Sequence, residues 1–78
     1  MISFKKWLMV YLVEHECYKD AVYDVAYDVK HDIDFPDSDD WEVYEEYLSG
    51  YAKENARNAL HIGFEKWKRE TGQFYIRL

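Results

Sequence analysis

Three aspartates recur at four-residue intervals in one predicted helix: Asp20, Asp24 and Asp28. In a helix this spacing stacks the carboxylates on one face, where each like-charge pair destabilises the helix by roughly 0.2–0.5 kcal/mol. Some sequences keep such a row to bind a basic partner, and it can also imitate a phosphate backbone. The more economical interpretation is a solvated face, or one neutralised by Lys19, Lys30 or the cations of the last helix.

Aromatic side chains provide further candidates for an interface with another protein. Tyr23 and Tyr27 flank the core face of the same helix, on the side away from the aspartates. Tyrosine is enriched in interface cores because it combines apolar area with a polar tip, although both residues could instead pack at the edge of the core with their hydroxyls in water.

The end of the sequence is also apolar, with Phe74, Tyr75, Ile76 and Leu78. These residues cover the core if the segment folds back, and form a docking strip if it projects.

The charges are unevenly distributed along the chain. Residues 1–52 carry four lysines and thirteen acids, a net charge of −9, whereas residues 53–78 carry six basic and three acidic residues, a net charge of +3. A nucleic-acid interface would need a basic cluster, and the candidates in the last helix are Lys53, Arg57, Lys66, Lys68 and Arg69. Acidic residues separate these cations on the helical wheel, and the total charge of −6 disfavours nucleic acid as the partner.

No spacing in the sequence is typical of a metal site or a catalytic site. His15 and Cys17 lack a second ligand pair. An EF-hand loop starting at Asp32 would place Pro36 at position 5, Asp37 at position 6 and Val43 at position 12, so the calcium pattern fails. Glycine-rich phosphate loops, G-x-S-x-G and HExxH are all absent. We therefore predict no enzyme activity, no cofactor and no metal.

Apolar residues at intervals of three and four predict the four helices that position these side chains. We expect helices over about residues 3–15, 19–31, 39–49 and 52–70, and no strands. Their predicted apolar stripes are Phe4, Trp7, Leu8, Tyr11 and Leu12; Ala21, Val22, Val25, Ala26 and Val29; Trp41, Tyr44 and Leu48, which Tyr51 would extend; and Ala56, Ala59, Leu60, Gly63, Phe64 and Trp67.

Several local features complete the expected elements. Met9, Val10 and Val13 widen the apolar surface of the first helix and predict that it is largely buried. In the loop that contains Pro36, we expect Ile33 and Phe35 to pack onto the core. We expect Ser38 or Asp39 to cap the third helix, Gly50 to mark its end or a kink, and Gly72 to stop the fourth helix.

Composition predicts a single small domain. The 78 residues include fifteen aromatic side chains, which supply much buried area, and one cysteine, which excludes an intramolecular disulfide. We expect one helical domain over residues 1–72 and an apolar segment over residues 73–78. The longest apolar run, Trp7 to Val13, is too short to cross a membrane. With the lone thiol and no targeting signal, this favours the cytoplasm.

The order and spacing of several of these residues resemble those of the YozE-type family of small bacterial domains. The similarity covers roughly residues 2–70, and its most specific part is the Phe-Pro loop with the aromatic third helix. The residues that carry it are Ser3-Phe4, Trp7-Leu8, Tyr11, Asp34-Phe35-Pro36, Tyr44 to Leu48, Ala56 and Phe64 to Trp67. Members are similar to the sterile alpha motif, a compact helical fold that elsewhere binds proteins and sometimes nucleic acids. The resemblance implies an all-α, compact four-helix bundle with no established enzyme activity or cofactor.

The sequence therefore predicts a non-catalytic, cytoplasmic protein-interaction module that binds another protein or itself. Its candidate binding residues are Asp20, Asp24, Asp28, Tyr23, Tyr27, Phe74 and Tyr75. The alternatives are a nucleic-acid-binding accessory domain that uses the basic last helix and, less favoured, an acidic inhibitor that mimics phosphates.

Overall fold

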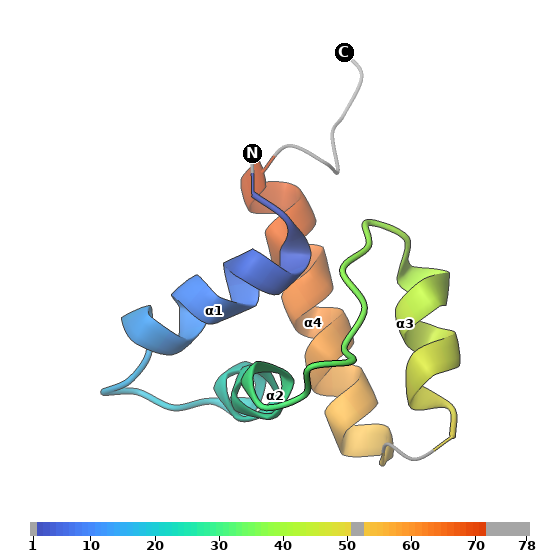
Figure 1. Cartoon of the computed structure of the whole chain (residues 1–78). Coiled ribbons are helices and arrows are strands. Elements are labelled where there is room, and N and C mark those ends of the chain that lie inside the picture. Colours follow the sequence, from blue (N-terminus) through green and yellow to red (C-terminus); the bar gives the residue numbers. More distant parts are fainter. Residues whose placement is uncertain (1, 51–52, 72–78) are drawn as a thin grey trace.

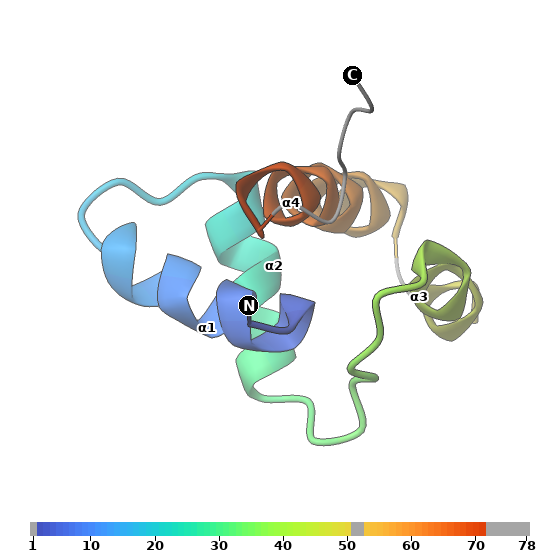
Figure 2. The ribbon, with the colours of Figure 1, turned by 90° about the horizontal axis from the view of Figure 1, so that it is seen from above.

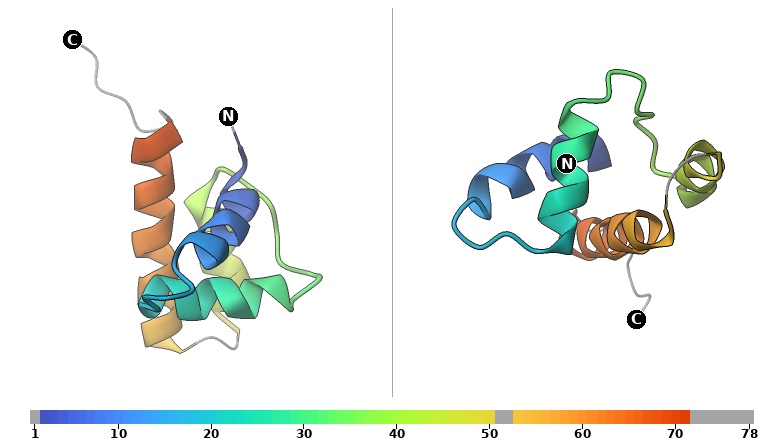
Figure 3. Two further views of the ribbon diagram at one scale, coloured as in Figure 1. Left: turned by 90° about the vertical axis from the view of Figure 1, so that its left-hand side faces the viewer. Right: turned by 90° about the horizontal axis from the view of Figure 1, so that it is seen from below.

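The computed structural model describes residues 2–50 and 53–71 and confirms the predicted all-α, four-helix fold. The helices are α1 (Phe4–Glu14), α2 (Ala21–Lys30), α3 (Trp41–Leu48) and α4 (Glu54–Thr71). Helix α4 lies in the middle of the molecule, with α1 and α2 packed on one side and α3 on the other (Figure 1). Helix α2 runs crosswise to α4, over its first half (Figure 3). The described part of the chain contains no strand.

The core is built from the predicted stripes, with aromatic rings at its centre. Phe4 of α1 is fully buried, and its ring lies 5.4 Å from that of Tyr44, 5.1 Å from that of Phe64 and 5.6 Å from that of Trp67. These centroid distances and tilted ring planes are typical of favourable aromatic pairs. Phe4 thereby joins α1, α3 and α4 in one cluster.

Glycine at position 63 allows α1, α2 and α4 to approach one another closely. A Cβ atom on Gly63 would lie 3.2 Å from Cγ1 of Val22, 3.6 Å from Trp7 and 3.8 Å from Leu8. The crossing of α2 over α4 (Figure 2) therefore depends on the missing side chain.

The cap of α3 differs from the prediction. Asp40, rather than Ser38 or Asp39, is the N-cap, and its side chain accepts a hydrogen bond from the Glu42 amide. The reason is that Tyr44 holds Ser38 outside the helix: the Ser38 amide donates to the Tyr44 hydroxyl, which in turn donates to the Ser38 carbonyl, both at 2.7 Å.

Four apolar residues predicted to be buried are exposed, among them Ala21 at the start of α2. Ile33 is 91% exposed because a turn closed by the bond from the Phe35 amide to the Asp32 carbonyl directs it outward, whereas Phe35 is buried as predicted. Val10 and Val13 are 42% and 76% exposed. They lie on the side of α1 away from its buried stripe, so α1 buries one face only.

Candidate functional site

A groove of about 590 Å³ lies between α2 and the first half of α4, and the ends of α3 and of the α2–α3 loop close it. We call it the α2–α4 groove. Most of its lining is apolar, namely Ala21, Val25, Val29, Phe35, Leu48, Ala56, Ala59 and Leu60. Its polar residues are Asp24, Asp28, Asp32, Tyr47, Lys53 and Asn55. The groove thus combines an apolar floor with a charged edge.

Small side chains on the two facing helices explain why the groove exists. Helix α2 presents Ala21 at its first turn, and α4 presents Ala56 and Ala59. Each of these methyl groups fills much less space than the valine and leucine side chains beside them, which leaves a hollow whose lining includes the buried Val29 and Leu60.

Two members of the predicted aspartate row form the acidic edge of the groove. Asp24 and Asp28 are exposed residues of α2, one helical turn apart, which corresponds to a rise of roughly 6 Å. Within residues 2–50 and 53–71, neither carboxylate has a hydrogen bond or an ion pair. The predicted pairing with Lys19 is not seen there: the Lys19 ammonium lies 5.5 Å from the centre of the Tyr23 ring.

Asp20 departs from the row because it precedes the helix. As the N-cap of α2 it accepts a hydrogen bond of 2.8 Å from the Tyr23 amide and one of 2.6 Å from the Tyr11 hydroxyl. Burial disfavours the charged form of Asp20, but these two hydrogen bonds outweigh it and hold the pKa of the carboxyl below its ordinary value. Asp20 therefore joins α1 to α2 and does not line the groove.

Asp32 continues the four-residue spacing of the row and lies at the closed end of the groove. Its carboxylate accepts a hydrogen bond of 2.6 Å from the Tyr47 hydroxyl of α3 and another from the Asp34 amide. From the sequence, Asp32 was considered only as the first residue of an EF-hand loop, although it continues the spacing of Asp20, Asp24 and Asp28. By contrast, no feature of the sequence marked Asn55 as a candidate binding residue.

The two tyrosines predicted as interface residues lie outside the groove. Tyr23 is half-buried and packs against the core. Tyr27 is 51% exposed, with its ring 4.8 Å from that of His31. Phe74 and Tyr75, the other predicted interface residues, lie outside the described residues.

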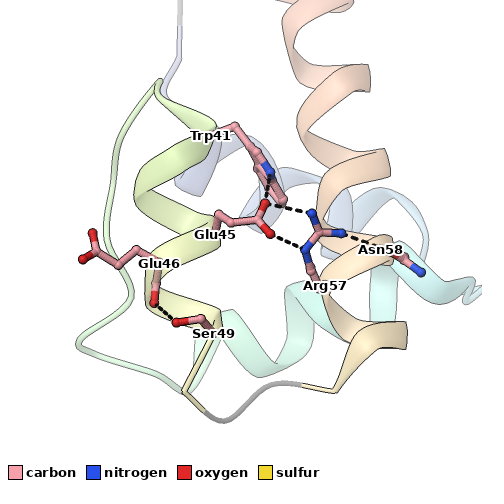
Figure 4. A network of polar contacts seen from close by, with 6 residues as sticks. All are labelled: Trp41, Glu45, Glu46, Ser49, Arg57 and Asn58. Carbon is pink, nitrogen blue, oxygen red and sulfur yellow. Dashed lines mark hydrogen bonds and ion pairs between the residues drawn. The ribbon is translucent and has the colours of Figure 1, made fainter.

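The basic residues predicted as a nucleic-acid interface lie in different surroundings in the structure. Arg57 makes two hydrogen bonds with Glu45 of α3, at 2.6 and 2.8 Å (Figure 4). The Lys68 ammonium lies 5.2 Å from the centre of the Phe64 ring. Lys66 lies beside Trp7 of α1, Arg69 is exposed, and Lys53 lines the α2–α4 groove.

Glu45 is the centre of the polar network between α3 and α4. Besides the Arg57 guanidinium, it binds Nε1 of Trp41 at 2.7 Å (Figure 4). These hydrogen bonds, that from Arg57 above all, hold the pKa of Glu45 below its ordinary value and raise the pKa of Arg57. Arg57 therefore attaches α3 to α4.

The histidines and the cysteine lie in ordinary packing environments. The ring of His15 stacks on Tyr11 at 3.7 Å, His61 lies 4.7 Å from Trp41 and 3.6 Å from a carboxylate oxygen of Glu65, and Cys17 is exposed. Within the described ranges, no group of three or more His, Cys, Asp or Glu side chains could hold a metal ion. None of the helices described is long and apolar enough to cross a membrane.

No family model, curated protein or solved structure matches the chain. The resemblance to the YozE-type family therefore stays a prediction from the residues that carry it.

Proposed function

We propose that the protein is a non-catalytic protein-interaction module and that the α2–α4 groove is its binding surface. The observation that carries the proposal is the position of the exposed carboxylates of Asp24 and Asp28 along the edge of an apolar hollow. Apolar area provides most of the affinity of a protein interface, while charges at its rim fix orientation and select the partner. The groove offers both on adjoining residues.

The sequence resemblance supports the same class of function. Domains similar to the sterile alpha motif serve elsewhere as protein-binding modules, and the four-helix fold is compatible with such a role. We further propose that the protein is bacterial and cytoplasmic, which the family resemblance and the single cysteine support.

The two alternatives have less support. A nucleic-acid interface would need its cations on one surface, whereas Arg57 is bound to Glu45, and Lys53 and Lys66 line two separate hollows. A phosphate-mimicking inhibitor would need an extended outward row of carboxylates, and Asp20 instead binds Tyr11.

Photo-crosslinking from the groove tests the proposal. A photoreactive amino acid replaces Asn55, an exposed residue that lines the groove, and in a matched control it replaces Ile62, an exposed residue of the same helix that does not. In an extract of the cells that naturally make the protein, we expect a discrete crosslinked protein from position 55 and not from position 62.

Charge reversal provides the second arm of this experiment. The double variant Asp24→Lys, Asp28→Lys changes two exposed side chains and should fold normally, but it should lose the crosslink at position 55. Equal crosslinking from both positions, or a crosslink that survives the charge reversal, would contradict the proposal.

A further inference from the structure

We infer that the occupant of the α2–α4 groove is an amphipathic helix of another protein, with lysines or arginines along the edge that faces α2. This inference rests on the function proposed above and adds the chemistry of the partner. It follows from the length of α2, the apolar lining of the groove and the charged residues that line it.

Helix α2, which lines one side of the groove, is long enough to accompany about two to three turns of a partner helix. Helix α2 has ten residues, so it extends over roughly 15 Å. A parallel or inclined partner helix would present two to three turns over that length, which is the usual extent of a helix bound in a groove. Large apolar side chains of the partner, such as leucine or phenylalanine, could pack on Ala56 and Ala59, which line the groove.

The charge on the α2 edge selects basic side chains in the partner. Asp24 and Asp28 are separated by one helical turn, so two cations three or four residues apart on a partner helix would lie at a matching spacing. Lys53, which immediately precedes α4, is the cation among the lining residues, and the neighbouring Asn55 is neutral. A basic side chain of the partner is thus favoured beside Asp24 and Asp28 and disfavoured beside Lys53, which would orient the bound helix.

Net charge favours a cationic partner over a second copy of this chain. The chain carries a formal charge of −6, so two copies repel one another, whereas a cationic helix is attracted at long range and associates faster at low salt.

Three designed peptides test the inference against the full chain. All carry the same apolar stripe with a spacing of three and four residues. The first has lysines on one edge of the stripe, the second has the same composition with its lysines on the opposite face, and the third has glutamates in place of lysines. Binding is measured by the fluorescence anisotropy of labelled peptide.

We expect the first peptide to bind with a Kd below about 1 mM, at least about threefold more tightly than the second, and the third not to bind. The double variant Asp24→Asn, Asp28→Asn should weaken binding of the first peptide by about three- to tenfold. The matched control Asp37→Asn, Asp39→Asn removes the same charge beside a different hollow, near Phe4 and Trp67, and should change binding by less than about twofold.

Equal binding of the first two peptides, or equal effects of the two double variants, would show general attraction to an acidic protein and overturn the inference. Self-association of the chain that depends on Asp24 and Asp28 would also overturn it, in favour of a second copy. These failures are distinct from failure of the proposed function. If the crosslink at position 55 captures a segment that is not a basic helix, only the present inference falls.

Discussion

The hydrogen bond between Tyr11 and Asp20 joins the end of α1 to the start of α2 at the scale of single residues. The hydroxyl donates to a carboxylate oxygen at 2.6 Å, and burial raises the pKa of Tyr11 above its ordinary value. Asp24 and Asp28 are the same residue type at the same spacing, yet they lie on the groove edge. The difference arises because Asp20 is the N-cap, with an extended backbone, and the other two are inside the helix.

We predict that Tyr11→Phe destabilises the fold by about 1 kcal/mol, because a partly buried carboxylate loses a donor. Tyr27→Phe is the matched control: its hydroxyl makes no hydrogen bond within the described residues, and we expect a change below about 0.5 kcal/mol. Urea unfolding followed by circular dichroism measures both. Equal losses in the two variants would contradict this role for Tyr11.

A second prediction concerns the pH dependence of the Glu45–Arg57 pair. Folding lowers the pKa of Glu45 from its ordinary value of 4.5, mainly through the hydrogen bond from Arg57. The ionised carboxylate therefore stabilises the folded state above about pH 4.5, and this contribution is lost as the pH falls through the lower folded-state pKa.

Glu45→Gln should consequently be less stable than the unmodified protein at neutral pH, and the difference should shrink as the pH falls below about 4.5. Urea unfolding at a series of pH values provides the measurement. Asp20 titrates in both proteins, so its effect cancels in the difference. If the difference in the free energy of unfolding between the two proteins stays constant with pH, Glu45 contributes through its shape and not through its charge.

At the scale of elements, Gly63 determines how closely α4 packs against α1 and α2. The Cβ of an alanine there would lie 3.2 Å from Val22, and a valine would place two more carbon atoms in the same space. We predict that Gly63→Val destabilises the protein by about 1–3 kcal/mol through overpacking. Gly63→Ala should cost less, because its better helix propensity offsets part of the strain.

Gly50→Ala is the control for this series. A Cβ atom at position 50 meets no atom within 4 Å, so we expect a change in the free energy of unfolding below about 0.5 kcal/mol. Thermal or urea unfolding distinguishes the variants. If Gly63→Val were as stable as Gly50→Ala, close packing at this crossing would not limit the fold.

The sequence was a good guide to the helices themselves because local patterns determine them. Each described helix begins and ends within two residues of its predicted bounds, since apolar residues spaced by three and four identify the buried face directly. The errors involve longer-range effects. Asp40 replaces Ser38 as the cap because Tyr44 binds Ser38, and Val13 is exposed because no described element covers its side of α1.

At the scale of the whole molecule, the groove could not be predicted because three separate parts of the chain create it. The carboxylates of Asp24 and Asp28 were predicted as a binding face, but their apolar neighbours Ala56 and Ala59 were assigned only to the core stripe of the last helix. The crossing of α2 over α4 brings these two sets together (Figure 3). Lys53 likewise changes from a candidate nucleic-acid contact to a residue of the groove edge.

The position of the bound peptide on the folded protein tests the central claim most directly. Amide chemical shifts of the isotope-labelled chain are followed by NMR while the peptide with lysines on one edge is added. If the groove is the binding surface, the largest changes fall within residues 21–29 of α2 and residues 53–60 at the start of α4, and the loop around Asp37 and Asp39 is unaffected. Changes centred on that loop or on the exposed side of α1, with α2 unaffected, would contradict the assignment of the groove as the binding surface.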